Sequence, residues 1–307
     1  MKPLLKFLRK KIRMITLILI LLFVIIVVVP LRFTFMITHN SFKSEEVFTN
    51  PKLLFRIDYE DIEFTTKDNL KIKGWLIKSK ENKSTVILCH GLFATMDDMI
   101  DCIPFLHQAR YNVVAFDFRN CGRSEGKITT LGYYETAELN SAVDFVLKQE
   151  SLSHNIIAWG KSMGAAVALL EASENPNIQG VIAESSFLSF KQTIAHHAKL
   201  LYGLPPFPMV YLTIFWVKVR TGIDPDKVDI INAVKKLDDR PVLFVGSEAD
   251  ERIPAKDAKR LFDECSSKNK ELWITKEGEH GGIFDANKNE YEKRVIEFLD
   301  KMKYEQL

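Results

Sequence analysis

The sequence predicts an α/β fold with a mostly parallel sheet, attached at its N-terminus to a membrane-spanning helix. Six short, continuously apolar segments alternate with helical stretches over residues 85–277, which is typical of parallel strands covered on both faces. Two alternating segments precede them, and a charge-free run occupies residues 14–31. With 307 residues and 47% hydrophobic content, the chain is long enough for a domain of about 250 residues and too apolar to be disordered.

The first 31 residues have the composition of a membrane anchor. Residues 1–13 contain six basic side chains and no acidic ones, and residues 14–31 read MITLILILLFVIIVVVPL. As a helix this run is about 27 Å long, close to the hydrocarbon thickness of a bilayer. Because basic residues cluster before the run, we expect a single-pass membrane protein with a cytoplasmic N-terminus and an extracytoplasmic body.

A cleaved signal peptide is the alternative interpretation of this segment. The end of the run, Val27-Val28-Val29-Pro30, lacks the small-x-small pattern of a cleavage site, so we expect the anchor to be retained. The predicted organisation is therefore a basic cytoplasmic segment at 1–13, the anchor at 14–31, a tether without clear periodicity at 32–55, and a folded domain at 56–307.

The folded domain is predicted to contain an eight-stranded sheet. IDYEDIEFTT (57–66) and LKIKGWLI (70–77) alternate around the turn Lys67-Asp68-Asn69, which favours an N-terminal antiparallel hairpin. The six buried strands that follow are TVILCH (85–90), NVVAFDF (112–118), NIIAWG (155–160), GVIAES (180–185), PVLFVGS (241–247) and ELWITKE (271–277). We expect helices on both faces of the sheet. Residues 187–239 form a long insertion rich in aromatic residues and prolines, which is expected to cover the strand ends as a cap.

A glycine-flanked serine follows the strand NIIAWG directly. The motif Gly160-Lys161-Ser162-Met163-Gly164 also opens a helical run, and in this strand–turn–helix context the turn raises the serine hydroxyl above the sheet. The helix N-terminus behind it favours negative charge. An incidental serine in a glycine turn is the alternative. Ser162 is therefore the candidate nucleophile.

Two further residues at strand ends complete the pattern. Asp250 follows the strand PVLFVGS, at the edge where ligand-facing residues of an open α/β sheet collect. Glu248 is a close competitor for its role, and Glu184 is a more distant one. His280 follows the last strand, and the chain order Ser, Asp, His is that of a hydrolytic triad on such a sheet.

Other histidines and loops receive different interpretations. His196 and His197 lie in the insertion and could line the site, but no strand positions them. The loop after TVILCH is expected to supply a backbone N–H, that of Leu92, which joins the N–H of Met163 to hold an oxyanion. Gly91 is expected to permit close approach of the backbone, and His90 is expected to shape this loop. The turn DFRNCGRSEG is expected to be structural, with Asp117 and Arg119 tying loops together.

Residues 56–304 resemble the α/β-hydrolase superfamily. The resemblance is carried by HGLF, DFRNCGRSEG, GKSMG, ADERIP and GEHGG, in this order and at normal spacing. More narrowly, the chain is similar to bacterial membrane-anchored serine hydrolases near the prolyl-oligopeptidase clan and to ABHD-type lipases. The resemblance implies Ser162 as nucleophile, His280 as base and Asp250 as its orienting acid, with Leu92 and Met163 as oxyanion donors.

The predicted function is hydrolysis of carboxylic esters through an acyl-enzyme, with no metal or organic cofactor needed. We expect an esterase or lipase-like enzyme, with lysophospholipids or monoacylglycerols as candidate substrates, because the cap is apolar and the anchor holds it near a bilayer. A serine peptidase or amidase and a thioesterase would use the same groups, and both alternatives stay open. A non-catalytic membrane scaffold is less favoured, since it has no need for Ser162, Asp250 and His280 together.

Composition excludes several other classes. Beyond residue 13 the 36 basic side chains are outnumbered by 40 acidic ones, so no basic surplus remains to bind nucleic acid. The four cysteines lack close spacing, which argues against a disulfide scaffold and against a cysteine-rich zinc site.

Overall fold

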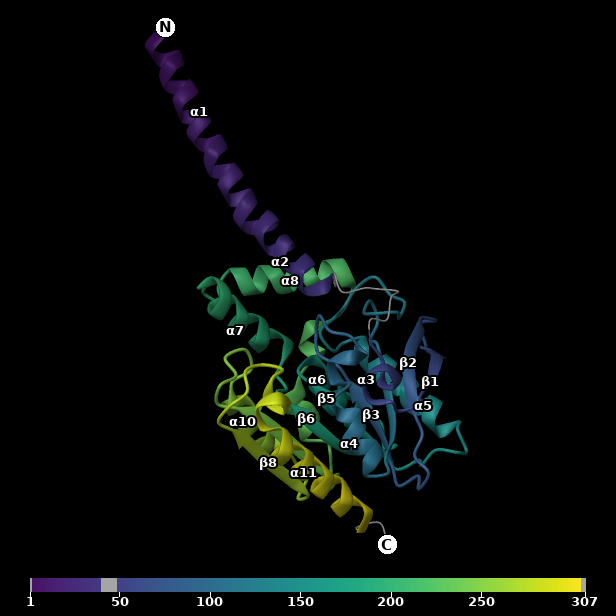
Figure 1. The fold of residues 1–307 in the computed structure, drawn as a ribbon. Coiled ribbons are helices and arrows are strands. Elements are labelled where there is room, and N and C mark those ends of the chain that lie inside the picture. Colours follow the sequence, from purple (N-terminus) through teal and green to yellow (C-terminus); the bar gives the residue numbers. More distant parts are fainter. Residues whose placement is uncertain (1, 40–48, 305–307) are drawn as a thin grey trace.

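The computed structural model describes residues 2–39 and 49–304. Within these residues the strands form one eight-stranded sheet in the order β1-β2-β4-β3-β5-β6-β7-β8 (Figure 1). Their bounds are β1 (Glu60–Thr65), β2 (Lys71–Ile77), β3 (Thr85–Cys89), β4 (Asn112–Phe116), β5 (Ile156–Lys161), β6 (Ile178–Glu184), β7 (Val242–Ser247) and β8 (Lys270–Thr275). Every predicted strand is present within a few residues of its expected ends.

The direction of the strands confirms the predicted fold class. β2 pairs antiparallel with both β1 and β4, whereas β3 to β8 pair in parallel. The strands β3, β4, β5 and β7 are buried along their whole length, because helices cover both faces and leave no side of the strand to water. The carboxyl ends of the parallel strands consequently lie at one edge of the sheet, where the loops after β3, β5, β7 and β8 meet.

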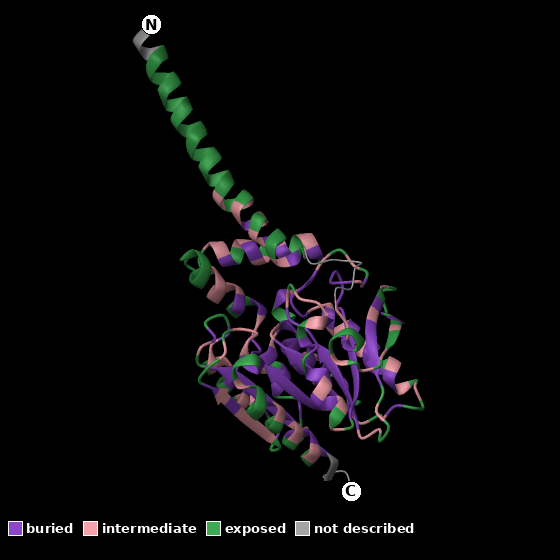
Figure 2. Ribbon diagram, in the orientation of Figure 1, coloured by how far each residue is buried: buried purple, intermediate pink, exposed green. Residues whose placement is uncertain are grey.

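Helices pack on the two faces of this sheet. One apolar layer contains side chains of α5, α6, α9 and α10, and the other contains side chains of α4 and α11; Figure 2 shows the buried sheet between them. The helices are α1 (Lys2–Phe23), a π-helical segment (Val24–Val28), α2 (Val29–Thr38), α3 (Pro51–Phe55), α4 (Cys102–Gln108), α5 (Glu135–Leu147), α6 (Met163–Ala172), α7 (Phe190–Tyr202), α8 (Met209–Thr221), α9 (Ile230–Val234), α10 (Ala255–Glu264) and α11 (Ile283–Tyr304), with short 3-10 turns at Met96–Met99 and Pro225–Lys227.

The N-terminal helix extends further than the predicted anchor. α1, the π-helical segment and α2 follow one another without a break and project from the body (Figure 1). In the described part of the chain, Leu5–Thr38 is the one helix long and apolar enough to cross a membrane. The structure differs from the expected tether at 32–55, because this helix continues to Thr38 and Thr34 and Thr38 are fully buried. Of the remainder, residues 40–48 lie outside the described residues and α3 is helical.

The insertion at 187–239 divides into two parts. α7 and α8 lie beyond the edge of the sheet where the parallel strands have their carboxyl ends (Figure 1). They are next to α2, the C-terminal part of the N-terminal helix, which we call its foot (Figure 1). α9 returns to the body, where Ile230 and Val234 are buried in the core. The cap therefore consists of α7 and α8, and α9 belongs to the layer of helices that covers the sheet.

Candidate active site

The turn between β5 and α6 holds Ser162 in a strained conformation. Its backbone has φ 55° and ψ −116°, a region that non-glycine residues rarely adopt and that costs on the order of 1–3 kcal/mol. A Cβ on Gly160 would lie 2.1 Å from the carbonyl oxygen of Gly164, and a Cβ on Gly164 would lie 1.9 Å from that of Cys89. Both glycines are therefore required by the turn, as the motif predicts, and the turn aims the serine at the edge of the sheet.

Three side chains from distant parts of the chain form a hydrogen-bonded row at this edge. His280 Nε2 lies 3.0 Å from Ser162 Oγ, and His280 Nδ1 lies 2.8 Å from Asp250 Oδ2. Ser162 follows β5, Asp250 follows β7 and His280 follows β8, so parallel strands deliver all three residues to one place. This arrangement can move a proton from the serine hydroxyl to the imidazole.

The carboxylate of Asp250 is buried, and both of its oxygens take part in hydrogen bonds. Its Oδ1 accepts hydrogen bonds from the backbone N–H groups of Arg252 (2.9 Å) and Ile253 (2.8 Å), and its Oδ2 accepts one from the Ser185 hydroxyl (3.0 Å) as well as facing His280. Burial acts to raise the pKa of Asp250, but these hydrogen bonds and the imidazole outweigh it and hold the pKa below its ordinary value. Asp250 is thus ionised at neutral pH and accepts from Nδ1–H, which leaves the Nε2 lone pair toward Ser162.

The structure separates Asp250 from the other acids considered for its role. Glu248 is exposed, and its backbone N–H donates to the carbonyl of Thr275 (2.9 Å). Glu184 is buried and accepts a hydrogen bond from the Tyr291 hydroxyl. The hydrogen bond of His280 goes to Asp250.

Two polar residues at the site were missed by sequence reasoning. Ser185 bonds Asp250, and its position directly after β6 was the available signal. Lys161 precedes the serine and is buried; its Nζ lies 3.3 Å from Asp98 Oδ2 and donates to the carbonyl of Gly281 (3.5 Å). Burial acts to lower the pKa of Lys161, but Glu184 and Asp98 raise it overall, so the ammonium stays charged and ties the turn of Ser162 to the loop of His280.

The loop after β3 lies against Ser162, as predicted. His90 Nε2 accepts a hydrogen bond from the N–H of Phe118 (2.9 Å), so Nδ1 carries the proton and donates to the carbonyl of Gly91 (2.7 Å). This pairing, inside a fully buried environment that lowers the pKa of His90, gives the histidine the loop-shaping role expected from the sequence. Leu92 follows in this loop, and Met163 is the first residue of α6, where the N–H has no partner within the helix.

Packing within the protein does not by itself require a glycine at position 91. A Cβ on Gly91 would lie 3.6 Å from Ser162 Cβ, which is ordinary van der Waals contact, and the role expected for Gly91 beside an oxyanion stays a prediction. The neighbouring turn has the structural role that was predicted. Asp117 accepts from the N–H groups of Met96 and Arg123, while Arg119 pairs with Glu138 and with Asp68 of the hairpin turn.

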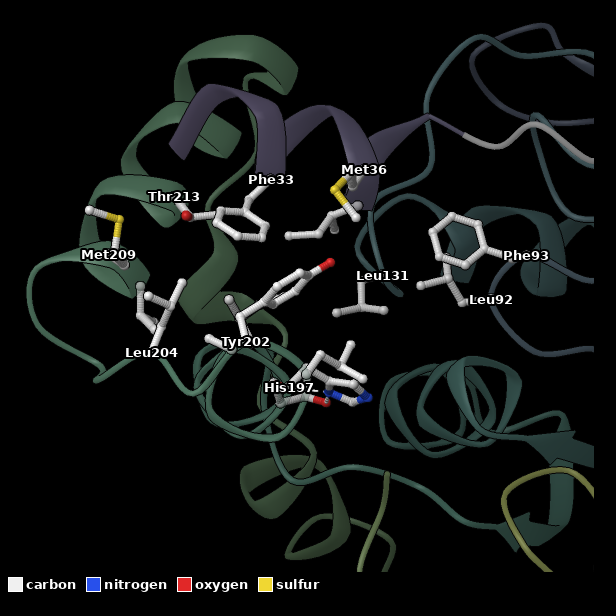
Figure 3. A pocket seen from close by; sticks show the side chains of 16 residues that line it. Phe33, Met36, Leu92, Phe93, Leu131, His197, Tyr202, Leu204, Met209 and Thr213 are labelled. Atoms are coloured by element: carbon white, nitrogen blue, oxygen red, sulfur yellow. Dashed lines mark hydrogen bonds between the residues drawn. The ribbon is translucent and has the colours of Figure 1, made fainter. Parts of the chain in front are cut away.

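An apolar cavity of about 190 Å³ adjoins this loop (Figure 3). Leu92 and Phe93 of the loop lie on one side of the view and Leu204 and Met209 of the cap on the other. His197 lines the cavity, whereas His196 bonds the carbonyl of Glu251 (2.8 Å). Among the described residues, no group of three or more His, Cys, Asp or Glu side chains is placed to hold a metal ion.

Comparison with known proteins identifies the family to which this fold belongs. A family model described as the alpha/beta hydrolase fold matches residues 84–214. YqkD of Bacillus subtilis is 33% identical over 237 residues, which cover 75% of this chain and 76% of YqkD. The membrane protein YNL320W of Saccharomyces cerevisiae is 28% identical over 73% of this chain and 74% of its own. Among solved structures, the Pyrococcus furiosus esterase Pf2001 has a TM-score of 0.72 and 28% identity, covering 86% of this chain and 98% of that one.

These similarities agree with the resemblance read from the motifs. The match to YNL320W fits the ABHD-type branch, and the fold shared with an esterase fits a hydrolase. One third of the residues are shared with YqkD over three quarters of both chains, and the family model covers the strands around Ser162. The protein is accordingly a hydrolase, and its chain belongs to the α/β-hydrolase family.

Proposed function

We propose that the protein is a membrane-anchored serine hydrolase that cleaves carboxylic esters through an acyl-enzyme. The observation that carries the proposal is the hydrogen-bonded row of Ser162, His280 and Asp250, with distances of 3.0 and 2.8 Å. The strained backbone of Ser162 supports it, because such strain collects at functional sites. The likeness to Pf2001, an esterase, favours esters over amides and thioesters.

The reaction follows from the groups in the row. His280 takes the proton of the Ser162 hydroxyl while Oγ attacks the acyl carbon, and the backbone N–H groups of Leu92 and Met163 donate to the oxyanion. His280 then gives this proton to the leaving alcohol, which departs and leaves the acyl group on Ser162. Water, deprotonated by His280, attacks the acyl carbon, the bond between this carbon and Ser162 Oγ breaks, and His280 returns the proton to Oγ as the acid leaves. Asp250 keeps the imidazole oriented and stabilises its charged form in both halves.

The test combines a covalent probe with a substrate panel. A fluorophosphonate phosphonylates an activated serine with loss of fluoride, so the full-length protein is expected to carry one adduct, located by peptide mass mapping on Ser162. On matched p-nitrophenyl ester, thioester and p-nitroanilide substrates, the ester is expected to have the highest kcat/KM. An adduct on another residue, or faster cleavage of the anilide, would contradict the ester hydrolase and favour a different nucleophile or a peptidase.

The anchor and its orientation form a second part of the proposal. α1 exposes apolar side chains along its length, six basic residues precede the spanning run, and the relative YNL320W is named a membrane protein. We therefore place the N-terminus in the cytoplasm and the body on the extracytoplasmic side. Protease added to spheroplasts that express the full chain with an N-terminal tag is expected to degrade the body and spare the tag. A body that resists until the cells are lysed would reverse this topology.

A further inference from the structure

The apolar cavity beside the oxyanion loop has walls from four separate parts of the chain, one of which is Leu131 in the segment before α5. Leu92 and Phe93 come from the loop that adjoins Ser162, the cap contributes residues of α7 and α8, and α2 contributes Phe33, Met36 and Ile37 (Figure 3). The membrane helix thus borders a cavity that is also lined by Leu92, the residue whose backbone N–H is a proposed oxyanion donor.

The foot of the membrane helix is held firmly in this position. The Thr34 hydroxyl donates to the carbonyl of Thr213 in α8 (3.3 Å), and the Arg220 Nε of α8 donates to the Thr38 hydroxyl (2.9 Å). The Phe33 ring contacts that of Tyr202 in α7, with 4.9 Å between centroids. Because hydrogen bonds and ring packing join α2 to both cap helices, the α2 wall is part of the folded domain.

A further contact joins α8 to the apolar run of the N-terminal helix. Trp216 of α8 donates from Nε1 to the carbonyl of Ile26 (3.3 Å), and Ile26 lies five residues before Leu31, the end of the predicted spanning run. At 1.5 Å per residue this is about 8 Å inside the apolar run, the depth at which interfacial helices lie. α8 itself packs against α2 (Figure 1), and its Tyr211, Phe215 and Val219, spaced four residues apart, are each more than half exposed.

The cavity lining matches an acyl chain. It is predominantly apolar, and the described lining residues include one histidine, His197, and no Asp, Glu, Lys or Arg. His197 Nδ1 is bonded to the carbonyl of Thr193 (2.8 Å), and burial lowers the pKa of His197, so the imidazole is neutral at pH 7. The lining residues Met36, Leu201 and Tyr202 are themselves exposed, which leaves the cavity open beside α2.

We propose that the foot of the membrane helix forms one wall of the acyl-binding site, and that the substrates are monoacyl esters that enter this site from the bilayer. The proposal rests on the ester hydrolysis proposed above and names its substrate class. The ester carbon lies at Ser162, and the chain runs past Leu92 into the cavity. Since an apolar cavity of about 150 Å³ holds a benzene molecule, a cavity of about 190 Å³ suits a single chain of roughly six to ten carbons.

Filling the cavity from two sides tests the acyl site. The full-length protein in phosphatidylcholine vesicles is assayed on p-nitrophenyl acetate and p-nitrophenyl decanoate. Ala198→Trp fills the cavity from α7, and Ile37→Trp fills it from the membrane helix. Each is expected to lower the decanoate-to-acetate ratio of kcat/KM by at least about ten-fold, because several methylene groups lose their place. The controls are Ala195→Trp on α7 and Phe35→Trp on α2, both outside the lining, and they should keep the wild-type ratio.

The outcomes separate this inference from the proposed function. A wild-type protein that cleaves acetate and decanoate, with unchanged ratios in both cavity-filling variants, would overturn the acyl site and leave the ester hydrolase standing. A decanoate-to-acetate ratio that falls in Ala198→Trp but not in Ile37→Trp would show that the membrane helix is not part of the acyl site. A wild-type protein that cleaves neither ester, and takes no fluorophosphonate at Ser162, would overturn both proposals.

A second comparison tests entry from the bilayer. The double variant Tyr211→Glu/Phe215→Glu places two charges on the exposed face of α8, where insertion among lipids becomes costly. We expect it to cleave 1-decanoylglycerol in phosphatidylcholine vesicles several-fold more slowly than wild type, relative to the same ester in detergent micelles. If the ratio of the vesicle rate to the micelle rate were the same in the double variant and in wild type, the ester would arrive from solution. That result would contradict entry from the membrane.

Discussion

Replacing Ser162 by alanine is expected to lower kcat for ester hydrolysis by about 10⁴- to 10⁶-fold. The hydroxyl is the atom group that faces His280 Nε2, at 3.0 Å, and alanine leaves the imidazole with no proton to accept and no oxygen to direct at the acyl carbon. Alanine keeps the Cβ and the strained backbone of the turn, so the fold should persist. The rate is measured with p-nitrophenyl acetate and the fold by circular dichroism.

The variant Ser162→Gly serves as the matched control for the turn. It removes the same hydroxyl and also relieves the left-handed backbone strain at φ 55°, so it should be equally inactive and should unfold at a higher temperature than Ser162→Ala. If Ser162→Ala retained hydrolysis within ten-fold of wild type while folded, Ser162 would not be the nucleophile.

Replacing Asp250 by asparagine is expected to lower kcat by about 10⁴-fold. The backbone N–H groups of Arg252 and Ile253 point at Oδ1, so an asparagine must place its carbonyl oxygen there and its NH₂ group opposite His280 Nδ1. An amide donor at this place favours the other imidazole tautomer, with the proton on Nε2. His280 then faces Ser162 with a donor and cannot accept the hydroxyl proton.

The neighbouring acid provides the control for this prediction. Glu248→Gln changes a carboxylate two residues away that is exposed, and it should keep kcat within about two-fold of wild type, the range of an ordinary surface substitution. The rates of both variants are measured on p-nitrophenyl acetate at pH 7 and above. A large loss in Glu248→Gln, together with an active Asp250→Asn, would transfer the orienting role to Glu248.

The sheet could be predicted because its information is local. A parallel strand buried on both faces is apolar at most positions, so β3, β4, β5 and β7 are recognisable as runs of four or five apolar residues. The site followed in part from the same property, since Ser162 comes directly after β5 and Asp250 comes three residues after β7. His280 follows β8, a strand that is only partly buried. Chain order then assigned each residue a place at one edge of the sheet.

Contacts between distant segments could not be predicted in the same way. The hydrogen bond from Lys161 to the carbonyl of Gly281 joins residues 120 positions apart. The sequence around either residue does not indicate a contact with the other. Likewise, the run after the anchor has no periodicity that separates a loose tether from a packed helix. Which of the two it becomes depends on whether another apolar surface is available, and here α8 supplies that surface.

The sequence by itself determined the fold class, the apolar N-terminal segment that is long enough to cross a membrane, and the identity of three polar residues at strand ends, because each of these depends on a run of neighbouring residues. Only the tertiary structure decided that His280 faces Asp250 rather than Glu248 or Glu184, and that α2 borders the cavity next to Leu92. The physical reason is that hydrogen-bond direction and side-chain packing depend on where separate elements meet in space, and composition along the chain does not specify those meetings.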